Sequence, residues 1–205
     1  MADRAAHARL LNSFSRMEYV GVRKILKSRR SDDLDHAGLQ HILDETVHAL
    51  RLKKAALALS EDPAAVATYS AAHTLAGDAG EAYLQGVDQA AAEALADLPE
   101  DTRADINYVL TSAAIEIRAQ AFYPLYESCL RATGASFSVS AILKDEDRHL
   151  GEMAAQLAAR LPDWRRRLER VLEVERDLFA AFMAAVSAVI EEPQAPRRGA
   201  PAVNA

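Results

Sequence analysis

AILKDEDRHLGEM, residues 141–153, places a charged pair where a helix should turn its apolar side toward a core. Ile142 and Met153 recur at the spacing of one helix face, and Glu146 and His149 fall on that same face. A Glu and a His three residues apart on a helix lie about 5 to 6 Å from each other at their Cβ atoms. The stretch therefore predicts a helix that carries one carboxylate and one imidazole into the interior.

A second copy of this pattern lies in the first quarter of the chain. HILDETVHAL, residues 41–50, holds Glu45 and His48 at the same spacing, and Leu34 and Leu52 lie along the same side of the helix. Glu and His side chains on facing helices of a bundle can bind metal ions together. The repeat predicts that the two Glu-x-x-His pairs build one site.

The composition predicts an all-α protein. Among the 205 residues, 50% are hydrophobic and 26% charged, with only 8 Gly and 7 Pro, and helix-forming Ala, Leu, Glu and Arg dominate. A chain of this length can bury one core, so we expect a single domain over residues 1–191. The Pro- and Ala-rich segment 192–205 lacks periodicity and is expected to be disordered.

Charge and cysteine content limit the expected cellular location and binding partners of the protein. The formal net charge of -6 argues against nucleic acid as the main partner, because phosphate binding favours a basic face. Cys129 is the only cysteine, so a disulfide framework is excluded and a cytoplasmic location is expected; we expect its thiol to be packed. No apolar run approaches eighteen residues, so neither a membrane span nor a signal peptide is expected.

Periodicity predicts five long helices in two antiparallel hairpins and a final helix. Their expected ranges are about 6–30, 34–59, 103–132, 136–160 and 163–191. The turn RRSDD separates the first two helices, and Asp32 or Asp33 is expected to cap the second. Residues 60–104 read as a long crossover with a short helix of its own.

The two remaining helices of the bundle offer single glutamates. Glu18 lies 27 residues before Glu45, with the turn near the midpoint, so both carboxylates are expected at the same height. On the third helix Glu116 and Glu127 are about 16 Å apart along the axis and cannot reach one centre together. Glu116 lies 30 residues before Glu146, comparable to the first hairpin, and is the predicted ligand.

Three further side chains are candidates for a supporting role. His41 lies one turn before Glu45 on the same face and is a seventh ligand, a hydrogen-bond partner of the ligands, or a packed core residue. Tyr123 flanks a substrate cavity, carries an electron, or packs in the core. Glu127 lines an access path, joins a hydrogen-bond network with Tyr123, or faces solvent. His7, His36 and His73 are expected at the surface or in the crossover.

The ligand order resembles that of the ferritin-like diiron-carboxylate proteins. The resemblance rests on Glu18, ETVH at 45–48, Glu116 and EDRH at 146–149, and extends over residues 10–160. IEIRAQAFYPLYE followed by LKDEDRHLGEM is similar, over about 40 residues, to the second half of the metal-binding bundle in the aldehyde-deformylating oxygenases of cyanobacteria. The resemblance implies a ferritin-like four-helix bundle, two antiparallel hairpins joined by a long crossover, with a fifth C-terminal helix.

Membership of that family would define the chemistry. It implies two iron ions cycling between Fe²⁺ and Fe³⁺, bridged by Glu45 and Glu146. The terminal ligands would be Glu18, Glu116, His48 and His149. The implied activity is that of an O₂-dependent diiron oxidoreductase, an oxygenase or oxidase acting on a small, largely apolar organic substrate. Electrons would come from a separate donor such as ferredoxin and its reductase, and a homodimer is the default assembly.

Other functions use the same ligand types. Ferritin- or rubrerythrin-like iron oxidation or peroxide reduction is one alternative, although rubrerythrins commonly carry a Cys-rich module that a single cysteine cannot supply. Hydroxylation of tRNA is another, and the acidic balance counts against it. A binding module without chemistry is the last, and the complete ligand set argues against it. The sequence leaves the substrate and the choice between iron and manganese open.

Overall fold

The computed structural model describes residues 3–28, 32 and 34–191, and this part of the chain is mainly helical, without a strand. Its elements are α1 (Arg4–Ser28), α2 (His36–Leu59), the 3₁₀ turn η2 (Pro63–Val66), α3 (Gly77–Ala94), α4 (Glu100–Ala132), α5 (Ser140–Arg160) and α6 (Trp164–Glu191). The all-α prediction is confirmed. The predicted disorder of segment 192–205 lies outside the described residues.

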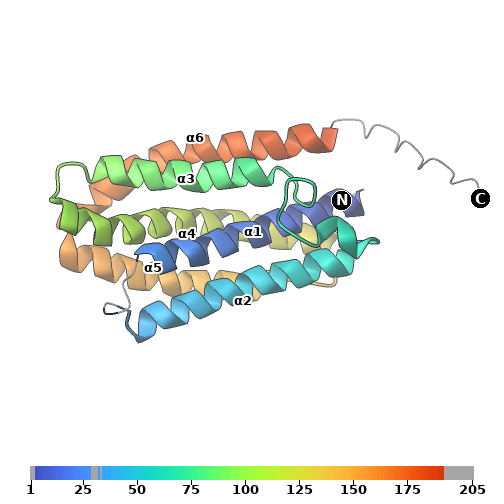
Figure 1. Ribbon diagram of the computed structural model, residues 1–205, viewed down its shortest axis with the longest axis horizontal. Coiled ribbons are helices and arrows are strands. Elements are labelled where there is room, and N and C mark those ends of the chain that lie inside the picture. Colours follow the sequence, from blue (N-terminus) through green and yellow to red (C-terminus); the bar gives the residue numbers. More distant parts are fainter. Residues whose placement is uncertain (1–2, 29–31, 33, 192–205) are drawn as a thin grey trace, which may run out of the picture.

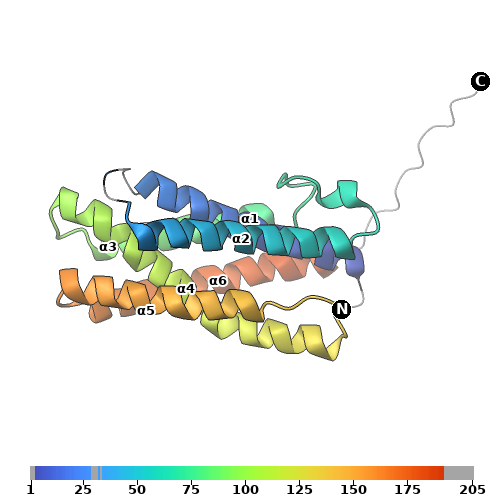
Figure 2. The same cartoon turned by 90° about the horizontal axis from the view of Figure 1, so that it is seen from below.

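The helices form three antiparallel pairs, α1 with α2, α4 with α5, and α3 with α6. Figure 1 shows α3 and α6 side by side along one edge, next to α1 and α4. Figure 2 shows α1 and α2 on one side of the bundle and α4 and α5 on the other. Each of the two predicted hairpins therefore exists, and their inner faces meet.

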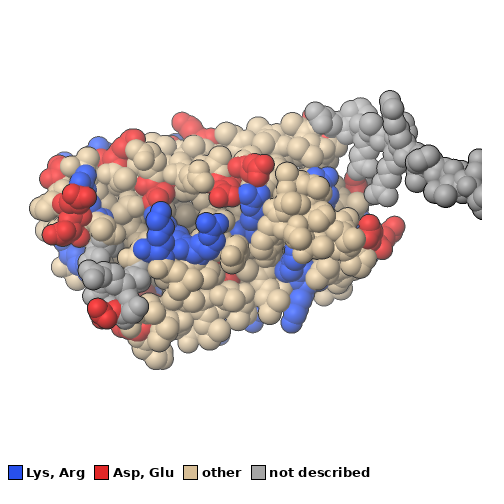
Figure 3. Space-filling view, in the orientation of Figure 1, with Lys and Arg blue, Asp and Glu red and all other residues tan. Residues whose placement is uncertain are grey.

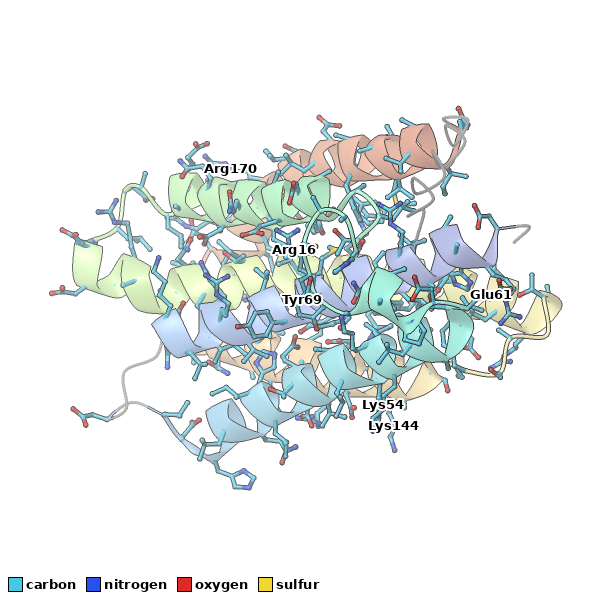
Figure 4. All side chains as sticks on the ribbon, turned by 45° about the vertical axis from the view of Figure 1, so that its right-hand side comes forward. Arg16, Lys54, Glu61, Tyr69, Lys144 and Arg170 are labelled. Carbon is cyan, nitrogen blue, oxygen red and sulfur yellow. The ribbon has the colours of Figure 1, made fainter. Side chains whose placement is uncertain are left out.

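The segment between the hairpins holds more helix than the sequence suggested. Besides η2 it contains α3, which is 18 residues long and lies against α6, α4 and α1. Buried polar side chains of α1 hold the connection in place: Asn12 Nδ2 donates to the carbonyl oxygens of Thr68 and His73 at 2.8 and 2.7 Å. The hydroxyls of Ser15 and Tyr69 are 2.7 Å apart, and Tyr69 lies over α1 in Figure 4. These contacts fix where α3 begins.

The N-cap of α2 differs from the predicted one. The N-cap of α2 is Asp35, whose Oδ1 accepts from the Gly38 amide at 2.8 Å, so the prediction of a cap at Asp32 or Asp33 is wrong. The reason is the start of α2 at His36, since only the residue directly before the first turn can accept from its free amides. Asp33 itself lies outside the described residues.

Two further expectations are corrected. His7 is buried, and its Nε2 lies 2.6 Å from the Tyr126 hydroxyl, so it belongs to the core between α1 and α4. Cys129 is exposed near the end of α4. Both positions follow from helix phase, which the sequence alone defines less well near helix ends than in the middle.

The face shown in Figure 3 carries charges of both signs. Lys and Arg side chains gather over α1, and Asp and Glu side chains gather toward α3. Arg16 pairs with Asp78 at 2.9 Å, and Lys24 pairs with Asp88. Figure 4 shows Arg16 between α1 and α3. Within the described residues, no helix is long and apolar enough to cross a membrane.

Candidate metal centre

Seven side chains from four helices converge inside the bundle in two overlapping groups. We call these groups site A, formed by Glu18, Glu45, His48 and Glu146, and site B, formed by His41, Glu45, Glu116 and His149. In each site the four donor atoms all lie within 4.8 Å of one another. All six predicted ligand residues are present, and Glu45 belongs to both sites. Either site could hold a metal ion.

Close packing of α1 against α2 brings Glu18 and Glu45 together. Gly21, one turn after Glu18, lies beside the Glu45 carboxylate, and a Cβ at this position would be only 2.9 Å from Glu45 Oε2. The absence of a side chain at Gly21 therefore leaves the space that Glu45 occupies. On α2 and α5 the i, i+3 spacing places the Glu and the His of each helix on one face, directed into the same cluster.

Glu146 connects the two sites through its two oxygens. Its Oε1 lies 3.2 Å from His48 Nδ1, and its Oε2 lies 3.3 Å from His149 Nδ1. His149 Nδ1 is also 3.6 Å from Glu116 Oε1 and 3.9 Å from Glu45 Oε1. Both imidazoles thus turn Nδ1 toward the carboxylates.

The opposite ring nitrogens meet aspartates in a reciprocal arrangement. His48 Nε2, from α2, lies 3.1 Å from Asp145 Oδ2 on α5, and His149 Nε2, from α5, lies 3.3 Å from Asp44 Oδ2 on α2. Each Asp directly precedes the Glu of its own helix, in DETVH and DEDRH. A carboxylate oxygen accepts a hydrogen bond, so in a neutral imidazole Nε2 carries the hydrogen and Nδ1 keeps its lone pair.

This cross-pairing could not be assigned from the sequence. The position of Asp44 and Asp145 next to the glutamates was visible, but the partner of each lies about a hundred residues away. Asp44 is also held by Arg148 on α5, which ties the two hairpins together at the site.

Buried negative charge dominates the electrostatics. Burial, with repulsion from neighbouring carboxylates, raises the pKa of Glu18 and Glu116 well above the usual range, and burial and Glu146 raise the pKa of Glu45 to about 7. Burial alone would lower the pKa of His48, but the surrounding carboxylates outweigh it and raise this pKa to about 10. Without a metal ion the cluster therefore retains protons that a divalent cation would displace.

One buried atom is left without a hydrogen-bond partner here. His48 Nδ1 lies inside the cluster, and its neighbour Glu146 Oε1, although 3.2 Å away, is not placed to accept a hydrogen bond. A buried imidazole nitrogen that faces carboxylate oxygens fits a metal ligand, because an ion between them satisfies both. The donor set of carboxylates and imidazoles suits divalent transition metals such as iron.

The three predicted supporting residues have different positions. The Tyr123 hydroxyl donates to Glu18 Oε1 at 2.7 Å, so it contacts site A directly. His41 lies in site B, with Nε2 3.2 Å from Glu45 Oε1. Glu127 is not part of either site: it accepts from the Val139 amide at 2.8 Å and from the Ser138 hydroxyl, and so holds the start of α5.

A cavity of about 200 Å³ adjoins both sites. It lies between α1, α3, α4 and α6, and its walls are largely apolar, formed by residues including Phe14, Met17, Ile115, Ala119, Phe122, Phe179 and Phe182. The lining includes the carboxylates of Glu18, Glu45 and Glu116 and also Gln85, an exposed residue of α3. The cavity therefore adjoins both the carboxylate cluster and a residue that reaches the surface.

The walls from α3 and α6 were not predicted. In the sequence these helices show only apolar periodicity, which serves core packing and cavity walls equally. Comparison of the chain with protein-family models, with curated proteins and with solved structures finds no significant match.

Proposed function

We propose that the protein is a ferritin-like nonheme diiron oxygenase or oxidase that uses O₂ to oxidise a small, largely apolar organic substrate. The observation that carries the proposal is the pair of four-residue sites that share Glu45 and line one apolar cavity. A dinuclear centre needs donors shared between two ions, and a substrate needs a dry space beside them.

The ligand roles follow from the contacts. Glu45 would bridge the ions because it belongs to both sites, and Glu146 would bridge because its oxygens face His48 and His149 separately. Glu18 and Glu116 would be terminal carboxylates, one in each site. When bound, two ferrous ions supply the electrons with which O₂ is activated.

Other residues prepare the site for this chemistry. Asp145 and Asp44 hold the two imidazoles in the orientation that directs Nδ1 inward. Tyr123 donates to Glu18 Oε1, which fixes one carboxylate oxygen and leaves the other for a ligand role. The aromatic walls exclude water and bind apolar groups next to the carboxylates.

Iron oxidation or peroxide reduction of the ferritin and rubrerythrin kind is the alternative. It would use the same ligands, but the apolar lining of the cavity favours an organic molecule over a hydrated ion. Hydroxylation of tRNA would need a surface that attracts phosphate, whereas the face in Figure 3 mixes both signs of charge.

Metal analysis tests whether the protein binds two iron ions, on which the proposal depends. The metal-free chain is loaded with Fe²⁺ under anaerobic conditions, and bound iron is measured beside the variants Glu116→Ala and Glu127→Ala. We expect one iron for each of the two sites in the wild type and in Glu127→Ala, and loss of iron at site B in Glu116→Ala. Wild-type protein without stoichiometric iron would refute the proposal.

Oxygen consumption tests the activity itself. The iron-loaded chain should consume O₂ when a ferredoxin and its reductase supply electrons, and small apolar compounds that fill the cavity should be oxidised. Uptake that ends after the bound iron is oxidised, and that no organic compound prolongs, would favour the iron-oxidation alternative. Gel filtration of the same protein tests the expected homodimer.

A further inference from the structure

We propose that His41 is a seventh metal ligand, so that site B binds its ion through two imidazoles and site A through one. The inference rests on the proposed dinuclear centre and makes its two halves unequal. His41 lies outside the repeated Glu-x-x-His pattern, and it reaches the site from the same helix as Glu45 and His48.

The distances around site B fit one ion among four donors. His41 Nε2 lies 3.2 Å from Glu45 Oε1 and 3.8 Å from Glu116 Oε1. His149 Nδ1 lies 3.9 and 3.6 Å from the same two oxygens. Ligand atoms about 2.1 Å from one ion lie about 3 to 3.4 Å from their nearest neighbours around it. The four separations scatter around this range, so two nitrogens face the same two oxygens closely enough for one ion to lie among them.

The two imidazoles are arranged to share that ion. The rings of His41 and His149 are 4.2 Å apart at their centroids and tilted by 41°, and each directs one nitrogen at the Glu45 and Glu116 oxygens. Both side chains are buried. Simple packing of two rings would not require both nitrogens to meet the same pair of carboxylates.

The far side of the His41 ring is also held in position. The Tyr108 hydroxyl, on α4, lies 2.7 Å from His41 Nδ1. This contact occupies the nitrogen that points away from the site and leaves Nε2 for the carboxylates and their ion. Tyr108 therefore corresponds to the aspartates that hold His48 and His149, with a neutral hydroxyl in place of a carboxylate.

Along α2, His41, Glu45 and His48 are separated by four and then three residues, which places all three on one face. One helix thereby supplies a nitrogen to each site and a carboxylate to both. The consequence is that site B, richer in nitrogen, binds ions that prefer imidazole, such as Co²⁺, more tightly than site A does. Loading should therefore proceed in two steps.

The test uses Co²⁺ as the probe. The metal-free full chain is titrated anaerobically, and proton NMR then counts the exchangeable imidazole N–H signals shifted by the paramagnetic ion. Each bound imidazole keeps one such hydrogen. We expect three signals in the wild type and two in His41→Ala, with site B more than about 100-fold weaker, beyond the 10- to 100-fold loss typical for a hydrogen-bond partner of a ligand.

Controls separate the ligand role from a structural one. Tyr108→Phe keeps the imidazole and should retain three signals. Added free imidazole should restore site B in His41→Ala, which would also show that this variant remains folded. Two bound Co²⁺ with only two signals in the wild type would overturn the His41 assignment and leave the dinuclear centre standing. Fewer than two Co²⁺ bound by the wild type would instead count against the proposed function itself.

Discussion

Buried carboxylates occur in two regions of this bundle, and their surroundings differ. Glu175 on α6 is 1% exposed and accepts from Arg118 Nε and Nη2 at 2.9 and 2.8 Å and from the Tyr83 hydroxyl at 2.9 Å. Among the carboxylates of sites A and B, Glu45, Glu116 and Glu146 are buried and Glu18 is partly buried, and together they outnumber the cations near them. In the first region, the charge of Glu175 is compensated by side chains of the protein itself.

The difference indicates what each region is for. A buried carboxylate is tolerated when a fixed cation and hydrogen bonds compensate for its desolvation, as Arg118 and Tyr83 do for Glu175. In the carboxylate cluster this compensation is incomplete, and the pKa of Glu18 and of Glu116 rises instead. The incomplete compensation supports the proposal that the cluster binds metal ions, whereas Glu175 is compensated within the chain.

The largest expected effect comes from the shared ligand. Glu45→Gln should reduce binding of both ions, because Glu45 belongs to both sites, whereas Glu18→Gln should weaken site A alone. Isothermal titration of the metal-free protein with Co²⁺ measures both. Equal losses in the two variants would show that the sites do not share Glu45.

Breaking the balanced region should affect stability and not metal binding. Arg118→Met leaves Glu175 buried without its cation, and we expect a loss of about 2 to 3 kcal/mol, reduced from the usual 3 to 5 because the Arg118 side chain is 26% exposed. Urea denaturation of the metal-free protein measures the loss, and the titration should still show two bound Co²⁺. A change in stoichiometry would mean that the regions are coupled.

Removing one charge from the carboxylate cluster should raise the stability of the metal-free protein, whereas Arg118→Met lowers it. Burial raises the folded-state pKa of Glu18 above its unfolded value, so its contribution to stability is complete below about pH 4.5 and is lost as the pH rises. Glu18→Gln lacks this loss and should be more stable than the metal-free wild type at pH 8.5.

Urea denaturation at pH 7.5 and 8.5 checks the sign. Both values lie above the range in which His41, whose pKa burial lowers to about 3, changes its charge on unfolding. Glu45 and His48 have raised pKa values as well, so some pH dependence should persist in the variant. If the Glu18→Gln protein is less stable than the wild type at pH 8.5, the charge of Glu18 does not destabilise the metal-free fold.

Sequence reasoning succeeded where a side chain acts through its own helix. The spacing of Glu45 with His48 and of Glu146 with His149 defines one inward face on each helix. The similar spans from Glu18 to Glu45 and from Glu116 to Glu146 put each single glutamate at the height of the Glu-x-x-His pair in its own hairpin. These are local periodicities, so the sequence alone predicted the helices and brought six of the seven cluster residues together.

It failed where a side chain acts through a distant partner. The pairing of His48 with Asp145 and the capture of the α5 start by Glu127 depend on how two helices rotate against each other. The cavity walls on α3 and α6 depend on where the crossover places α3, which Asn12 and Ser13 determine through buried hydrogen bonds. Such relations are set by tertiary packing and leave no periodic signal.

The smallest expected effect concerns the gap that α1 leaves for Glu45. In Gly21→Ala the new Cβ would meet Glu45 Oε2 at 2.9 Å, so the carboxylate must shift, while the helix gains about 0.5 to 1 kcal/mol from losing a glycine. We expect the metal-free protein to keep or slightly gain stability and Co²⁺ to bind up to about tenfold more weakly, about 1.4 kcal/mol. Gly151→Ala on α5 is the matched control, because its Cβ would meet no atom within 4 Å, and it should stabilise without altering Co²⁺ affinity. Unchanged affinity in both variants would show that the Glu45 carboxylate has room to move, and the close contact of α1 with α2 would then serve packing alone.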